Sequence, residues 1–285
     1  MRTPRPILLI AGGVGGLPTL EAVAARCPGR TVHYVADTAR GGFGHSSPAA
    51  AVHHVEQLLQ HTSRLHPALV LLASHTLSAA CLPALKARLP HLTIAGVTEP
   101  AARAAAQAAG ATYKPTIGVL AGSTAINSRG LQAAIGRRRS RATVLLQPCP
   151  LLAPLVEEGR GTGDKLLRTA LKQYLRPMLD RKPDVILLGG GHLSKLKPAV
   201  QELAGDGCRV VDAVAATAED VARRLGPVPA GDAPADLACH VTDDPARFAR
   251  LGRRLCDLDL PPADVIPLAD LPILDLPDAG LRRAG

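Results

Sequence analysis

The chain has 285 residues, of which 47% are hydrophobic and 20% charged, a balance typical of a globular protein long enough for two lobes. Its formal net charge of +9 favours an anionic partner. With three tyrosines, two phenylalanines and no tryptophan, the chain has too few aromatic residues for base stacking; it also has no recognition motif, so we expect no nucleic-acid partner.

The N-terminal segment imitates a signal peptide, because a basic stretch precedes the apolar residues 7–10. The apolar run is short and leads directly into the glycine-rich residues 12–16, so we predict a first strand followed by a turn. No segment approaches the roughly 20 apolar residues of a membrane span, and we expect no membrane partner. The six cysteines are scattered, with no Cys-x-x-Cys pair, and predict neither a disulfide framework nor a metal site. We therefore expect a cytoplasmic protein.

Predicted strands and helices alternate along the chain, and the pattern restarts near Pro100. Before the restart, the predicted strands are 7–10, 31–36, 69–73 and 93–97, and the predicted helices are 17–26, 47–59 and 77–88. After it, the predicted strands are 116–121, 143–147, 184–188 and 209–212, and the predicted helices are 100–109, 125–136, 164–179, 198–203 and 217–225. A final strand and helix, 238–242 and 244–254, follow a proline-rich linker.

This alternation predicts an α/β fold with parallel sheets. The restart predicts two pseudo-symmetric lobes, the first built from residues 1–98 and 212–257 and the second from residues 99–211. Residues 258–285 are rich in proline and leucine and are interpreted as a C-terminal tail.

Two apolar strands of similar design, one in each predicted lobe, organise the candidate site. The first is followed by Ser74, His75 and Thr76, and the second by Gly190, Gly191 and His192. Ligands of open α/β sheets bind at the carboxyl ends of such strands. We therefore expect a cleft between the lobes, with both strand ends facing it.

The glycine-rich turn at residues 12–16 raises the alternative of a dinucleotide site, with Asp37 about twenty residues further on. The spacing does not fit, because the glycine expected three positions after Gly15 is Pro18. This motif therefore does not support a nicotinamide or flavin cofactor.

Several motifs carry a resemblance to a known family over nearly all of residues 7–255. They are the turn at 13–17, Asp37 to Arg40 with Ser47-Pro48, residues 96–100, Cys149-Pro150-Leu151 with 154–159, and 242–245 ahead of Phe248. On these residues the chain resembles glutamate racemase, in the aspartate/glutamate racemase superfamily. The resemblance implies the two-lobed fold and a cofactor-free enzyme, in which one cysteine removes a proton from an α-carbon and a second returns it to the opposite face.

The chain departs from the family at the positions that carry this chemistry. Ser74-His75-Thr76 stands where the family has Cys-Asn-Thr, and Gly190-Gly191-His192 where it has Cys-Thr-His. Ala11-Gly12 replaces Asp-Ser, and Ala125 replaces a threonine. A serine hydroxyl is far too weak an acid to replace a thiolate without a neighbouring base, and glycine has no side chain. We therefore predict that ordinary glutamate or aspartate racemisation is absent or very slow.

The candidate catalytic residues are His192, Ser74 and His75. The candidate substrate-binding residues are Gly12, Gly13, Phe43, Gly44, Thr76, Gly190 and Gly191. Each has an ordinary alternative: a histidine can be a satisfied core residue, and a serine after a strand can cap a helix. Asp37 and Arg40 are interpreted as holding their loop against the sheet, and Cys149 as structural.

Three functions from different classes remain open. The first is a cofactor-independent enzyme that acts at the α-carbon of a small amino acid or carboxylate through histidine and serine, as an altered isomerase, lyase or decarboxylase. The second is a racemase that uses these residues unconventionally. The third is a non-catalytic descendant that binds a small anion or a protein. We expect no cofactor and no metal, and the alanine-rich helices leave room for a homodimer.

Overall fold

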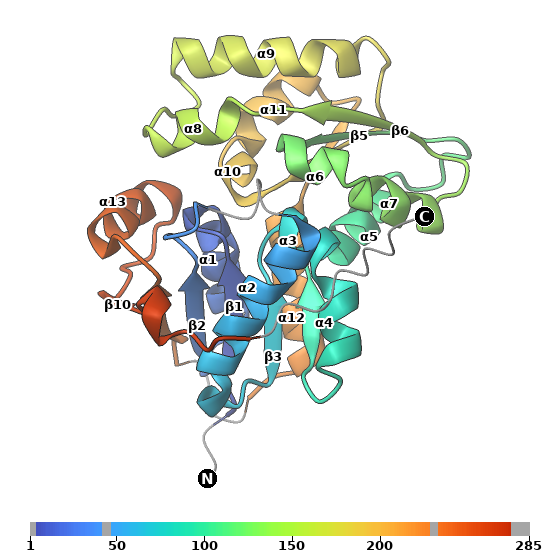
Figure 1. Ribbon diagram of the computed structural model, residues 1–285. Coiled ribbons are helices and arrows are strands. Elements are labelled where there is room, and N and C mark those ends of the chain that lie inside the picture. Colours follow the sequence, from blue (N-terminus) through green and yellow to red (C-terminus); the bar gives the residue numbers. More distant parts are fainter. Residues whose placement is uncertain (1–3, 42–46, 229–232, 275–285) are drawn as a thin grey trace, which may run out of the picture.

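The computed structural model describes residues 4–41, 47–228 and 233–274. Within them the chain forms two parallel sheets, one of six strands in the order β10-β9-β2-β1-β3-β4 and one of four in the order β6-β5-β7-β8. Figure 1 shows the four-stranded sheet and its helices above the six-stranded sheet. We call the two halves the first lobe, around the six-stranded sheet, and the second lobe. The predicted α/β fold with two parallel sheets is confirmed.

The strands of the first lobe are β1 (Ile7–Ala11), β2 (Thr31–Ala36), β3 (Leu69–Leu72), β4 (Ile94–Gly96), β9 (Asp236–Val241) and β10 (Ala263–Val265). Its helices are α1 (Leu17–Arg26), α2 (Pro48–His61), α3 (His75–Ala80), α4 (Leu82–Arg88) and α13 (Pro245–Leu255). The strands of the second lobe are β5 (Thr116–Ala121), β6 (Thr143–Pro148), β7 (Val185–Gly189) and β8 (Arg209–Asp212). Its helices are α5 (Thr98–Ala108), α6 (Ser123–Asn127), α7 (Gly130–Arg138), α8 (Leu152–Glu157), α9 (Lys165–Leu179), α10 (Gly191–Ser194) and α11 (Lys197–Ala204). Helix α12 (Ala213–Leu225) packs against both α1 and α5.

Strands β1, β3 and β7 are buried at every position, which explains why their sequences show no alternation of polar and apolar residues. The strand order β2-β1-β3-β4 in the first sheet is repeated as β6-β5-β7-β8 in the second. The order reverses between β1 and β3 and again between β5 and β7. Ligands bind at such switch points, so the topology directs both strand ends to the candidate site.

Two of the predicted helices are broken. The predicted helix 77–88 is two helices, α3 and α4, because Pro83 lies in the first turn of α4. The predicted helix 125–136 is divided between α6 and α7, where Arg129 adopts a left-handed conformation with φ of 53°. Part of the predicted tail forms β10, which pairs in parallel with β9. Among the described residues, no helix combines the length and apolar character that a membrane span requires.

Candidate functional site

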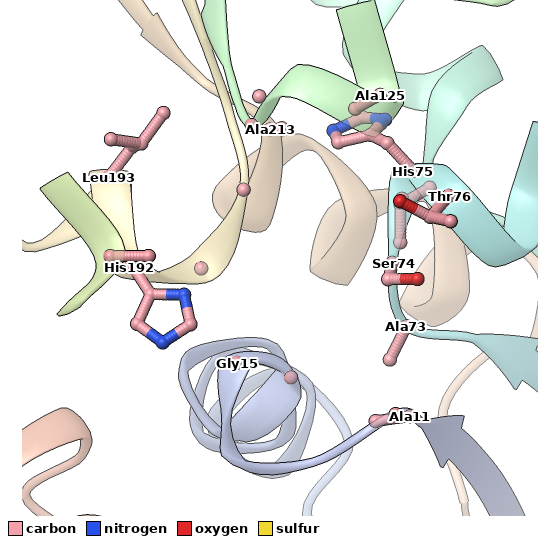
Figure 2. A pocket seen from close by; sticks show the side chains of 18 of the residues that line it. Ala11, Gly15, Ala73, Ser74, His75, Thr76, Ala125, His192, Leu193 and Ala213 are labelled. Carbon is pink, nitrogen blue, oxygen red and sulfur yellow. The ribbon is translucent and has the colours of Figure 1, made fainter. Parts of the chain in front are cut away.

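A cavity of about 370 Å³ lies where the carboxyl ends of the two sheets face each other. Four segments contribute most of its wall, namely residues 11–16, 73–76, 122–125 and 189–193. The structure brings eight of the predicted site residues to this wall: Gly12, Gly13, Ser74, His75, Thr76, Gly190, Gly191 and His192. The other two, Phe43 and Gly44, lie outside the described residues. Figure 2 shows His192 on one side of the pocket and Ser74 with Thr76 on the other.

His192 is paired with a carboxylate. Its Nε2 lies 2.9 Å from Oε1 of Glu157, the last residue of α8, and both side chains are partly exposed. The hydrogen bond from His192 holds the pKa of Glu157 below its ordinary value, so Glu157 is a carboxylate at neutral pH. Glu157 also lines the pocket. The sequence pattern does not single out Glu157 as a candidate site residue, although it lies in the 154–159 motif.

Gly15 and Gly191 allow the glycine-rich turn to lie very close to α10. A Cβ atom on Gly15 would lie 2.7 Å from Cε1 of His192, and one on Gly191 would collide with the carbonyl oxygen of Gly15. Side chains at either position would therefore push His192 away from the turn. The imidazole is held between Gly15 on one side and Glu157 on the other.

Gly190 opens towards free space. An added Cβ there would meet no heavy atom of the described residues within 4 Å, so the missing side chain leaves open space. The backbone has a φ of +156°, a conformation that residues with side chains rarely adopt. Helix α10, which follows, receives no side-chain cap from Gly190.

Ser74 caps helix α3. Its backbone is extended, and its Oγ accepts a hydrogen bond of 3.1 Å from the Leu77 N–H. The structure therefore gives Ser74 the ordinary capping role that the sequence left open. Its hydroxyl proton can still be donated into the pocket. Among the described residues, no histidine or carboxylate is hydrogen-bonded to Ser74, so no base activates it as a nucleophile.

His75 occupies a different environment from His192. It is only 4% exposed, and its Nδ1 lies 3.3 Å from Oγ1 of Thr98 at the start of α5. Its Nε2 is buried and has no hydrogen-bond partner in the described part of the chain. Burial lowers the pKa of His75 to about 4, so the ring is neutral at physiological pH. No hydrogen bond links the His75 ring to the Ser74 hydroxyl.

Asp37 and Cys149 make contacts that fit structural roles. Asp37 is fully buried, accepts a 3.0 Å hydrogen bond from Thr242 and pairs with Arg40 at 3.1 Å, which fits the predicted role of holding the loop. Cys149 lies against the pocket, but burial raises the pKa of its thiol to about 12, and its Sγ donates to the Ala121 carbonyl at 3.2 Å. A thiol in this state is inert as a nucleophile.

Comparisons with known proteins agree with this geometry. The model of the Asp/Glu/Hydantoin racemase family matches residues 19–221. The chain is 34% identical over 266 residues to a glutamate racemase of Gloeobacter violaceus, covering 93% of this chain and 97% of the relative. The chain belongs to this racemase family. A glutamate racemase of Syntrophus aciditrophicus is 30% identical, over 92% of this chain and 97% of the relative.

Solved structures of the family share the fold. Glutamate racemase isoform RacE1 from Bacillus anthracis superposes with a TM-score of 0.82 at 22% identity, covering 95% of this chain and 100% of that chain. The Thermus thermophilus glutamate racemase, in complex with beta-chloro-D-alanine, gives a TM-score of 0.81 at 27% identity over the same shares. The two-lobed arrangement of this racemase-family chain is thus the arrangement of the family.

The two lobes contribute different chemical groups to the pocket of this family member. The second lobe contributes the His192–Glu157 pair, and the first contributes hydroxyls and the neutral His75 ring. At the positions where the resemblance places the family's two cysteines, the chain has Ser74 and Gly190. Within the described ranges, no group of three or more His, Cys, Asp or Glu side chains is arranged to hold a metal ion.

Proposed function

We propose that this chain is a cofactor-independent enzyme that transfers a proton at the α-carbon of a small amino acid or carboxylate. The observation that carries the proposal is the His192–Glu157 pair in the wall of the pocket between the lobes. Histidine is the side chain that most often transfers protons near neutral pH, and a carboxylate partner fixes the orientation of its ring. Membership of the racemase family supports chemistry at an α-carbon.

In the proposed mechanism, the Glu157 carboxylate accepts the Nε2–H of His192 and fixes the tautomer of the ring. Nδ1 is then free to accept the α-proton, and the carboxylate stabilises the imidazolium that forms, as in other carboxylate–histidine pairs. The same nitrogen returns the proton to the carbanion. Ser74 and Thr76, across the pocket, orient the substrate carboxylate together with backbone N–H groups at Gly190 and Gly191.

This mechanism supplies a base on one face only. The other face meets the first lobe, where Ser74 has no activating base among the described residues. Exchange of the α-hydrogen with solvent should therefore be faster than inversion of configuration.

The one-sided arrangement also favours a second candidate, a decarboxylase or lyase on the same fold. Decarboxylation breaks the bond between the α-carbon and the carboxylate, releases CO₂ and leaves an electron pair that needs one proton. His192 as imidazolium can deliver that proton without a second acid. Product analysis separates the two reactions, because decarboxylation releases CO₂ and exchange does not.

A non-catalytic anion-binding descendant is the third candidate. The engagement of the Ser74 hydroxyl as a helix cap and the absence of a side chain at Gly190 support it. A thermal-shift screen of small carboxylates and amino acids, followed by α-deuterium wash-in in D₂O monitored by NMR, discriminates these functions. Wash-in or CO₂ release supports an enzyme, whereas stabilisation by a ligand without either reaction supports a binding protein.

For the compartment, we propose the cytoplasm. All six cysteines are free and buried, which fits a reducing environment.

A further inference from the structure

The His75 ring forms one end of the pocket, next to α6. Figure 2 shows it beside Ala125, on the Ser74 side and away from His192. Helices α3 and α6 belong to different lobes and pack against each other here. A substrate whose α-carbon lies at His192 would extend its far end towards His75.

The Nε2 of His75 is buried, and no side chain or backbone group of the described residues is hydrogen-bonded to it. Only 4% of the residue is exposed, and the other ring nitrogen already faces Thr98 Oγ1. A buried polar group without a hydrogen bond costs about 1–3 kcal/mol, so such groups are rare unless something outside the chain satisfies them. Because the residue lines the pocket, a bound ligand is the natural partner.

The neutral state of the ring restricts what it can recognise. Burial lowers the pKa of His75 to about 4, so at neutral pH the imidazole offers one donor and one acceptor but no charge. The Thr98 hydroxyl can donate to Nδ1 or accept from it, and Nε2 takes the complementary role. A carboxamide or ureido group carries both a donor and an acceptor, so it can satisfy Nε2 in either tautomer.

The charges around the pocket disfavour a second carboxylate at this end. Among the described residues of its wall there is no lysine or arginine, and Glu157 contributes a negative charge. A side-chain carboxylate placed beside His75 would lose its hydration without gaining a cation. The nearby position 125 carries alanine, which has no hydroxyl to donate to it.

We infer that His75 is a specificity-determining residue, whose neutral imidazole hydrogen-bonds an uncharged amide or ureido group at the far end of a monocarboxylic substrate. The inference rests on the proposed function for the placement of the α-carbon at His192. It assigns this pocket to substrates that are shaped like dicarboxylic amino acids but lack the second charge.

Glutamine and glutamate provide a matched pair of probes, since they have the same size and differ in charge at the far end. Binding of both enantiomers of each, and of citrulline as a ureido probe, is measured by calorimetry. Protein labelled with ¹⁵N-histidine reports the imidazole nitrogens of His75 in the same titrations. We expect glutamine or citrulline to bind at least about tenfold more tightly than glutamate, and to shift the Nε2 resonance of His75.

Variants test the residue itself. His75→Asn, alone and with Ala125→Thr, should reduce the preference for the amide about tenfold, whereas His91→Asn, at an exposed position outside this pocket, should leave it unchanged. If these variants unfold, the wild-type titration still decides. Equal or tighter binding of glutamate, amide binding that leaves the His75 resonance in place, or no binding of either uncharged probe overturns the inference.

The proposed function is tested separately. If glutamine binds through His75 but does not exchange its α-hydrogen for deuterium, the inference about His75 stands, and the proposed mechanism does not act on glutamine. If the protein prefers glutamate and exchanges its α-hydrogen, the proposed function stands and the inference about His75 is refuted.

Discussion

The two lobes share a strand order, yet their central strands end in different ways. After β3, Ser74 caps α3. The side chain of the next residue, His75, is buried, and its Nε2 has no hydrogen-bond partner among the residues that the structure describes. After β7, Gly190 provides no cap, and His192 remains partly exposed with its Nε2 bound to Glu157. The same side chain is therefore suited to recognition in one lobe and to proton transfer in the other. Burial and the presence of a carboxylate decide between these roles.

The largest expected effect concerns the stability contributed by His75. Burial lowers its pKa from 6.5 to about 4, so between these pH values the unfolded chain binds a proton that the folded chain does not. Stability from this group is complete above pH 6.5 and falls as the pH drops towards 4, by roughly 3 kcal/mol in total. Urea unfolding of the wild type and His75→Gln from pH 7 to pH 4 measures it. Equal pH dependence in the two proteins would show that His75 is not buried in a neutral state.

The next effect concerns catalysis at His192. His192→Asn keeps a similar size and polarity but removes the imidazole that would transfer the proton, so turnover of any identified substrate should fall on the order of 10² or more. The change is expected in kcat, with little change in melting temperature. His91→Asn serves as the control because His91 is exposed and lies away from the pocket between the lobes. Full activity in His192→Asn would make His192 an ordinary structural histidine.

Glu157→Gln should have a smaller effect than His192→Asn. The variant keeps a hydrogen-bonding side chain for Nε2 of His192 but removes the negative charge that stabilises the imidazolium formed in the proposed proton transfer. We expect kcat to fall about tenfold, with little change in melting temperature. A loss of rate that comes with a large drop in melting temperature would mean that Glu157 only supports the local fold.

The smallest effect is expected for the cap at the end of β3. Ser74→Ala removes the acceptor for the Leu77 N–H and should destabilise the protein by about 1 kcal/mol. Ser74→Asp provides another capping acceptor and should recover most of that stability. If Ser74 also orients the substrate carboxylate, Ser74→Asp should remain defective in binding because it adds a negative charge. Chemical denaturation and ligand titration of both variants separate the two roles.

Most of the fold could be predicted from the sequence, because buried parallel strands such as β1 and β7 have apolar runs of characteristic length. The helix breaks were harder to predict, since Pro83 is compatible with a helix start and Arg129 gives no signal of its left-handed backbone. The residues that follow β3 and β7 line the pocket, because the carboxyl ends of central parallel strands meet at one edge of each sheet. Glu157 was missed because its partner lies 35 residues away in the sequence. The burial of His75 depends on Thr98 and Ala125, which the chain brings to it only through packing between the lobes.

The close approach of Gly191 to Gly15 limits how this sequence could acquire the residues that the family resemblance places here. Those residues are cysteine at position 190 and threonine at position 191. The first change meets open space, although the backbone there is unfavourable for a side chain. The second would drive a Cβ into the carbonyl oxygen of Gly15. Threonine at position 191 therefore becomes acceptable only after the turn or α10 has shifted, so the substitutions have a required order, and a thiol alone does not complete the pattern.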